Sequence, residues 1–124
     1  MEIELKLVAI GLLFVFIFIS GFWLYRTGKP INTVILTLHK LISLAAAVLI
    51  AISLRQLGNS ARMSTPEIIL IVVTGLLFLL AILSGGWLST GKPAPVILMA
   101  AHRVTPFLCV LSTVTTFYLV FQAP

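Results

Sequence analysis

The two histidines of the chain, His39 and His102, stand at matching positions of a sequence that repeats itself. Each is followed by a base, Lys40 or Arg103, and each lies nine residues after the proline of a Thr-Gly-Lys-Pro motif. An imidazole can ligate a metal through either ring nitrogen, or form hydrogen bonds within the protein. A duplicated unit with one histidine apiece can bring two imidazoles face to face, and this pairing is the main indication of function.

The repeat extends well beyond the histidines. A Gly-Leu-Leu-Phe motif begins at Gly11 and a Ser-Gly-x-Trp-Leu motif at Ser20, and both begin again 64 residues later, at Gly75 and Ser84. The Thr-Gly-Lys-Pro motif returns after 63 residues, one residue out of step. The chain therefore reads as two copies of one unit.

Composition excludes a soluble domain. Of 124 residues, 60% are hydrophobic and 9% charged, whereas soluble chains carry about 25% charged residues. Four segments are apolar over the roughly 20 residues that a helix needs to cross a bilayer. The predicted fold is an all-α membrane protein, a four-transmembrane-helix bundle built from two parallel repeats of a helical hairpin. The single membrane domain, 1–124, would contain repeats 5–55 and 66–122, with spans 5–25, 31–54, 68–88 and 94–121.

The net charge of +5 is spread along the predicted helices and short loops. We therefore expect it to set the orientation in the membrane and not to bind nucleic acid. Glu2 and Glu4 at the start, and the length of the first apolar segment, predict a retained span and not a cleaved signal peptide. The single cysteine, Cys109, is expected to be an apolar core residue.

The distribution of bases predicts which side faces the cytoplasm. With four spans, the short loops 26–30 and 89–93 lie on one side of the membrane, and both termini lie on the other. The side with the short loops has five bases and no acid, whereas the other has three bases and three acids. Basic residues near span ends favour the cytoplasm. We expect a prokaryotic-type plasma membrane, with the short loops cytoplasmic and the termini opposite.

Residues in the loops predict where helices end and begin. Gly28 and Gly91 are expected to adopt positive φ and end the first and third helices. Pro30 and Pro93 suit the first turn of the helix that follows, where a missing N–H costs nothing. Thr65 is expected to cap the third span.

The geometry of such a bundle suits a haem. Parallel repeats are related by a pseudo-two-fold axis along the membrane normal, so the second and fourth spans become diagonal partners. His39 and His102 then lie at equal depth, roughly 13 Å beyond the prolines. Helices in contact are 8–10 Å apart, which makes the diagonal roughly 12–14 Å, about the width of imidazole–iron–imidazole. The expected cofactor is one haem b per chain, with these two histidines as axial ligands.

The neighbours of the histidines have two interpretations each. Lys40 and Arg103 lean toward the face with the short loops, where they would pair with haem propionates or extend to lipid headgroups. Gly21 and Gly85 each follow a serine. These small residues would leave room for the haem ring, or simply let helices pack closely.

The combination of four spans, a Ser-Gly pair near the end of one span and a histidine early in the next resembles the small haem-binding membrane cytochromes b. These include the cytochrome b561-like four-helix proteins and the haem-bearing anchor subunits of succinate dehydrogenase. The resemblance covers most of the chain and is architectural. It implies that His39 and His102 are axial ligands. Typical b561-like proteins hold two haems with four histidines, whereas the two histidines here imply one haem.

The leading hypothesis is an integral membrane b-type cytochrome that transfers electrons through one bis-histidine haem. A quinone, another membrane subunit or a second copy of the chain would be its partner in the bilayer. Any enzymatic activity would be redox chemistry at the haem. Two alternatives stay open: a haem-free structural or assembly subunit of a larger membrane complex, and a small transporter. The spans lack the midplane carboxylate that a proton-coupled transporter would need.

Overall fold

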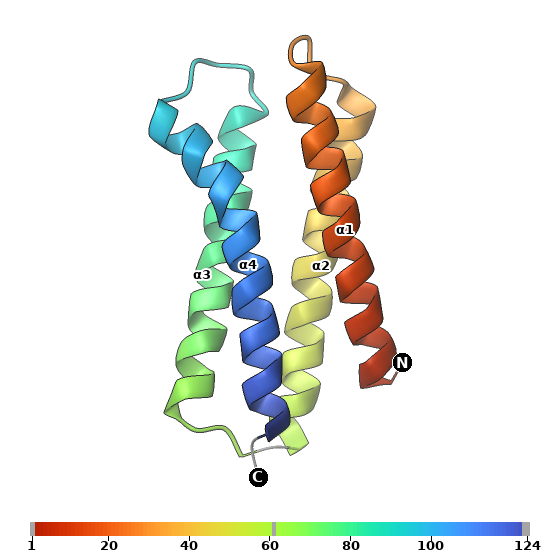
Figure 1. Cartoon of the computed structure of the whole chain (residues 1–124), viewed down its shortest axis with the longest axis vertical. Coiled ribbons are helices and arrows are strands. Elements are labelled where there is room, and N and C mark those ends of the chain that lie inside the picture. The colour runs from red at the N-terminus through yellow and green to blue at the C-terminus, as the bar shows by residue number, and fades with distance from the viewer. Residues whose placement is uncertain (1, 61, 123–124) are drawn as a thin grey trace. The chain divides into compact units, whose positions relative to one another are not determined.

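The chain folds into four long α-helices (Figure 1). The computed structural model describes residues 2–60 and 62–122, and the regular secondary structure of these residues is entirely helical. Each helix is long and apolar enough to cross a membrane. The predicted fold class, an all-α membrane protein with four spanning helices, is confirmed. The helices are α1 (Ile3–Thr27), α2 (Thr33–Ser60), α3 (Thr65–Leu88) and α4 (Val96–Gln122).

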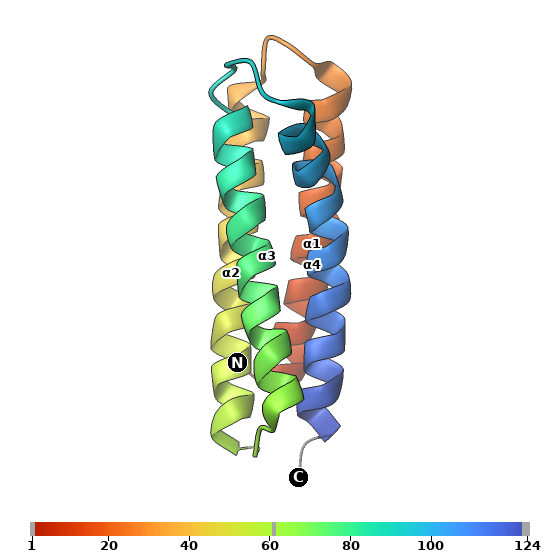
Figure 2. The same cartoon turned by 90° about the vertical axis from the view of Figure 1, so that its left-hand side faces the viewer.

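Two compact units make up the chain, residues 1–55 and 56–124. The first unit contains α1 and α2 as far as Arg55, and the second contains α3 and α4. In each unit the two helices run antiparallel and are joined by a short loop, as Figures 1 and 2 show. We call α1 with α2 the first hairpin and α3 with α4 the second hairpin.

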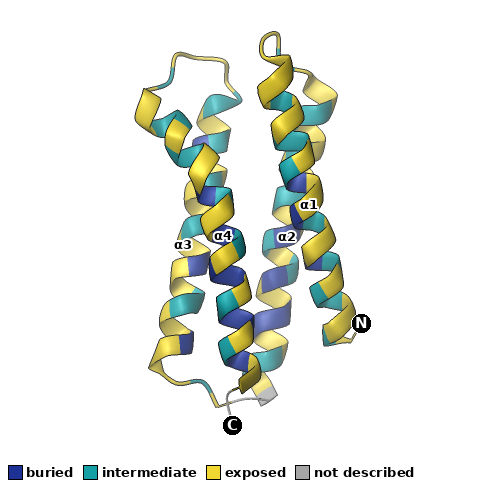
Figure 3. Ribbon diagram, viewed as in Figure 1, coloured by how far each residue is buried: buried dark blue, intermediate teal, exposed yellow. Residues whose placement is uncertain are grey.

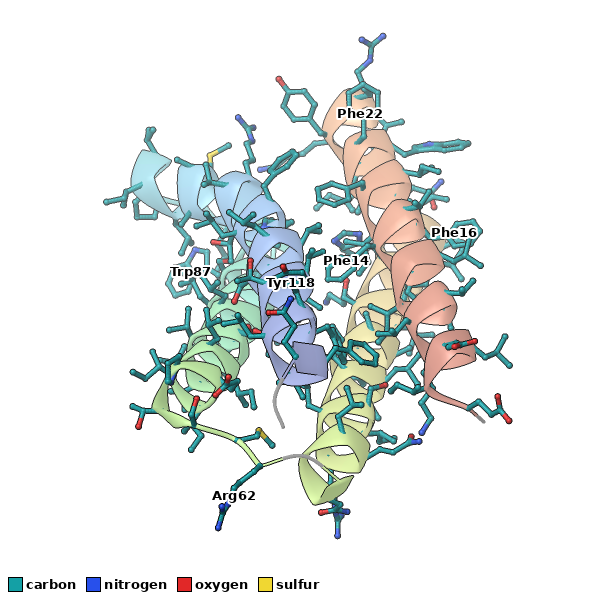
Figure 4. The ribbon with its side chains drawn as sticks, turned by 60° about the horizontal axis from the view of Figure 1, so that its bottom comes forward. Phe14, Phe16, Phe22, Arg62, Trp87 and Tyr118 are labelled. Carbon is teal, nitrogen blue, oxygen red and sulfur yellow. The ribbon has the colours of Figure 1, made fainter. Side chains whose placement is uncertain are left out.

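Large apolar side chains cover much of the surface of both hairpins, where the ribbon in Figure 3 is mostly exposed. Figure 4 shows Phe16 and Phe22 projecting outward from α1, and they are 52% and 62% exposed. Val96 on α4 is 83% exposed. Soluble monomers rarely expose contiguous apolar patches larger than a few hundred Å², whereas lipid hydrocarbon solvates such side chains. The chain is therefore an integral membrane protein.

The glycines of the short loops adopt the predicted conformation. Gly28 has φ 61° and ends α1, with its N–H donating to the carbonyl of Leu24 at 3.2 Å. Gly91 has φ 73° but follows α3 by three residues, so the prediction that it ends the third helix was wrong; Ser89 is the residue at that helix end. A positive φ is strained for residues with a Cβ, so glycine is the residue that lets each chain segment turn back.

The second helix of each hairpin begins later than predicted. Asn32 Oδ1 accepts hydrogen bonds from two backbone N–H groups in the first turn of α2, at 3.0 and 3.2 Å. Asn32 is therefore the cap, and Pro30 lies before the helix. In the second hairpin α4 begins at Val96, three residues after Pro93. The prediction that the prolines occupy first turns was wrong. In α2 the side chain of Asn32 accepts the hydrogen bonds of the first-turn N–H groups, so the helix begins after Asn32 and not at Pro30.

Two further helix ends differ from their predicted places. Ser64 and not Thr65 caps α3, and its N–H donates to Glu67 Oε2 at 2.7 Å in a capping box. At the other end of the long loop, α2 continues to Ser60, six residues beyond the predicted end at 54. A helix need not end with its apolar run, because Arg and Gln are good helix formers.

Hydroxyl groups join the two helices of the second hairpin. Thr74 Oγ1 on α3 hydrogen-bonds Ser112 Oγ on α4 and lies 3.3 Å from Thr116 Oγ1, and all three residues are buried. The position of the first repeat that matches Thr74 is Ile10, also buried. The second hairpin therefore has polar cross-helix bonds where the first has apolar packing.

Replacing Thr74 by valine should destabilise the second hairpin. The change keeps the shape of the side chain but removes its cross-helix hydrogen bonds, which in membrane proteins average about 0.6 kcal/mol each. We expect a loss of about 0.6–1.2 kcal/mol in unfolding by SDS from mixed micelles. Thr115→Val is the matched control, because Thr115 Oγ1 donates to the Leu111 carbonyl of its own helix. Equal losses in the two variants would contradict a cross-helix role for Thr74.

Candidate functional site

Both histidines occupy the same place in their helices. His39 lies six residues after Thr33, the first residue of α2, and His102 lies six residues after Val96, the first residue of α4. Both side chains are partly buried. At about 1.5 Å per residue, each imidazole is roughly 9 Å along its helix. An ionisable side chain at such a depth is costly unless it faces other protein groups.

In the first hairpin, α1 supplies the contacts that hold His39. Ser20 Oγ lies 2.8 Å from His39 Nδ1, within hydrogen-bond distance. The adjacent Gly21 brings the backbone of α1 against the ring, since a Cβ built on Gly21 would lie 3.2 Å from His39 Cε1. A glycine is therefore needed for the ring to approach α1 this closely.

The second hairpin makes the same arrangement around His102. Ser84 Oγ on α3 lies 3.0 Å from His102 Nδ1, and Ser84 is almost completely buried. A Cβ on Gly85 would lie only 2.7 Å from His102 Cε1. The next residue, Gly86, has no atom within 4 Å of its Cβ position. Only the first of the two consecutive glycines serves the histidine.

Each hairpin thus holds its imidazole in a Ser-Gly cradle, formed by Ser20 and Gly21 in the first hairpin and by Ser84 and Gly85 in the second. Sequence reasoning assigned the small residues to close packing or to the haem ring, and it missed their contact with the histidines. The spacing of the serines and histidines in the sequence did indicate this contact. Each serine precedes its histidine by 18 or 19 residues across a short loop, a spacing that places both at similar depth on antiparallel helices.

The predicted basic residues lie outside the cradles. Lys40 and Arg103 directly follow the histidines and are exposed. Successive residues of a helix are about 100° apart around its axis, so neither base shares the direction of the imidazole beside it. The rings are held by their hydrogen bonds with the serines and by their contacts with the glycines.

The helices that carry the histidines differ one turn further on. In α2, Ser43 Oγ donates to the carbonyl of His39 at 2.7 Å. In α4 the corresponding residue is Pro106, which has no N–H for the carbonyl of His102. The first turns of α4 are inclined to the rest of the helix (Figure 1). We attribute this inclination to Pro106, since proline is the usual cause of a kink.

The ligand groups present suit a haem better than a bare metal ion. Among residues 2–60 and 62–122, no group of three or more His, Cys, Asp or Glu side chains could hold a metal ion. Haem iron is different, because the porphyrin supplies most of its ligands and the protein adds the axial ones, often histidine. An imidazole anchored through Nδ1 has the arrangement of a ligand that binds through Nε2. The residues of each cradle therefore fit an axial haem ligand.

Comparison with known proteins does not identify a relative: no protein-family model, curated protein or solved structure matches the chain.

Proposed function

We propose that the protein is an integral membrane b-type cytochrome in which His39 and His102 are the axial ligands of one haem b. The observation that carries the proposal is the cradle that both hairpins build. In each, a serine is hydrogen-bonded to the imidazole at Nδ1, and a glycine, which has no Cβ, leaves space for the ring. Ligating histidines nearly always have their second nitrogen hydrogen-bonded in this way.

The haem, when bound, would supply one-electron transfer. The chain itself would bind the iron, orient the two imidazoles and exclude water through the apolar helices around them. Electrons would be exchanged with a quinone in the bilayer or with a neighbouring membrane subunit, on the side of the short loops. Any enzymatic activity would be redox chemistry at this haem.

Lys40 and Arg103 are proposed to neutralise the haem propionates. Each directly follows an axial ligand and is exposed, so its long side chain can reach a carboxylate at the membrane surface. Charge-assisted hydrogen bonds of this kind are roughly twice as strong as neutral ones. Lys40→Met and Arg103→Met keep the apolar stems and remove the charges. If propionates are the partners, these variants bind haem more weakly than the native chain.

An optical spectrum of the protein purified in detergent tests the proposal directly. A Soret band, one haem per chain and a low-spin spectrum typical of two imidazole ligands are the expected results. A chain that stays colourless with haem in excess contradicts the proposal. It would favour the alternative of a structural or assembly subunit, in which the histidines only join helices.

We also propose that the loops 26–30 and 89–93 face the cytoplasm, because the bases gather there. Single cysteines at Thr90 or Asn59, in a Cys109→Ser background, would test this in intact cells. A membrane-impermeant maleimide should label Asn59→Cys and leave Thr90→Cys unlabelled until the cells are broken. The reverse pattern would overturn the orientation.

A further inference from the structure

We propose that Ser20 and Ser84 are positioning residues that hold both imidazoles in the tautomer protonated at Nδ1, so that Nε2 carries the lone pair that binds iron. The inference rests on the proposed haem function for its purpose. The tautomer itself follows from the hydrogen bonds within each hairpin. It can therefore be tested without haem.

The first step is to locate the single proton of the Ser20 hydroxyl. Ser20 Oγ lies 2.7 Å from the carbonyl oxygen of Phe16 and 3.1 Å from that of Ile17. A carbonyl oxygen only accepts hydrogen bonds, so the short contact with Phe16 requires the hydroxyl proton to point there. Ser20 Oγ then has only lone pairs to offer His39 Nδ1, at 2.8 Å. His39 must be the donor in that bond.

The same reasoning applies to the second hairpin. Ser84 Oγ donates to the carbonyl of Leu80 at 2.7 Å and also lies 3.2 Å from that of Ala81. Its bond to His102 Nδ1, at 3.0 Å, therefore has the imidazole as donor.

The position of the proton determines which nitrogen can ligate. A neutral imidazole protonated at Nδ1 has its lone pair at Nε2. The glycine of each cradle faces Cε1, the ring atom between the two nitrogens, so the ring is fixed at one nitrogen and along one edge. The cradles therefore set both the tautomer and the orientation of the ligand before any iron binds. Such preorganisation reduces the cost of binding.

Nuclear magnetic resonance of the full chain, prepared without haem and labelled with ¹⁵N at histidine, tests the tautomers. Long-range proton–nitrogen correlations distinguish the protonated nitrogen from the one with a lone pair. At a pH well above the ordinary imidazole pKa of about 6.5, we expect both rings to be protonated at Nδ1 alone. Protonation at Nε2, or at both nitrogens, would overturn the inference whether or not haem binds.

Variants then test the role of the hydroxyls. Ser20→Ala and Ser84→Ala should each move the histidine in the same hairpin away from the Nδ1–H tautomer and leave the other histidine unchanged. Their haem affinity should fall about 10- to 100-fold, the usual cost of losing such a partner. Ser20→Thr and Ser84→Thr keep an oxygen acceptor and should restore much of both properties.

Ser53→Ala is the matched control for these serines. Ser53 is a buried serine of α2 whose Oγ donates to the Leu49 carbonyl of its own helix at 2.7 Å, and its loss should change neither tautomer. Unchanged tautomers in both cradle variants would overturn the role of the hydroxyls. The expected tautomers in a chain that never binds haem would instead remove the proposed function and leave the hydrogen-bond assignment intact.

Discussion

Replacing both His39 and His102, the proposed axial ligands, by alanine should abolish haem binding, and replacing either one should weaken it strongly. Loss of a group that hydrogen-bonds a metal ligand typically costs about 10- to 100-fold in metal affinity, and loss of the ligand itself should cost more. His39→Ala and His102→Ala should each change the spectrum from six-coordinate low-spin to five-coordinate high-spin iron. The double variant should contain no haem above background. Haem per chain, measured as the pyridine haemochrome, and the optical spectrum report these outcomes.

The single variants also test whether both histidines ligate the same haem iron. If they do, each substitution alters the whole haem signal, and the native chain contains one haem. A native content of two haems, with half of the signal lost in each variant, would show instead that each hairpin binds its own. Thr37→Ala is a suitable control, because Thr37 is exposed on the same helix as His39 and its Oγ1 donates to the backbone of that helix. A signal that survives in both histidine variants would remove the histidines from the site.

The fold was predictable because composition decides it. Long apolar runs can satisfy their backbone polar groups within lipid as helices, and the four runs each appear as one helix. The positive φ of Gly28 and Gly91 was predictable for a related reason, since local sterics alone favour glycine in that conformation. The helix ends that depend on competing local acceptors were less predictable. Asn32 and Ser64 cap α2 and α3 in places where the proline pattern and Thr65 had indicated another start.

The candidate site could be found only in part from sequence. Repetition singled out the two histidines, the two bases and the two glycines, because each has a counterpart in the other repeat. Repetition could not show that Ser20 bonds His39, since this requires the rotation of α1 relative to α2 about their axes. That rotation depends on the packing of the whole hairpin. Nor could the sequence separate Gly85 from Gly86, which differ only in which of them faces the ring.

The unequal fit of the two cradles predicts a graded effect of alanine. A Cβ at residue 85 would lie 2.7 Å from His102 Cε1, so the ring must move, whereas at residue 21 the corresponding distance of 3.2 Å needs only a small shift. His102 cannot move freely without stretching its 3.0 Å bond to Ser84. Gly85→Ala should therefore weaken haem binding about 10- to 100-fold, as loss of the serine contact would. Gly21→Ala should have a smaller effect in the same direction.

Gly86→Ala provides the sharpest control, because it makes the same chemical change one residue away. Nothing lies within 4 Å of its Cβ position, and alanine in a helix is favoured over glycine by about 1 kcal/mol. This variant should keep the native haem affinity and unfold at a slightly higher SDS fraction. Overpacking costs about 1–3 kcal/mol, so Gly85→Ala should lose stability even without haem, and its His102 imidazole signals should shift. If Gly85→Ala and Gly86→Ala behave alike, or Gly21→Ala is the more damaging of the cradle variants, the close contact between glycine and imidazole is not what holds these rings.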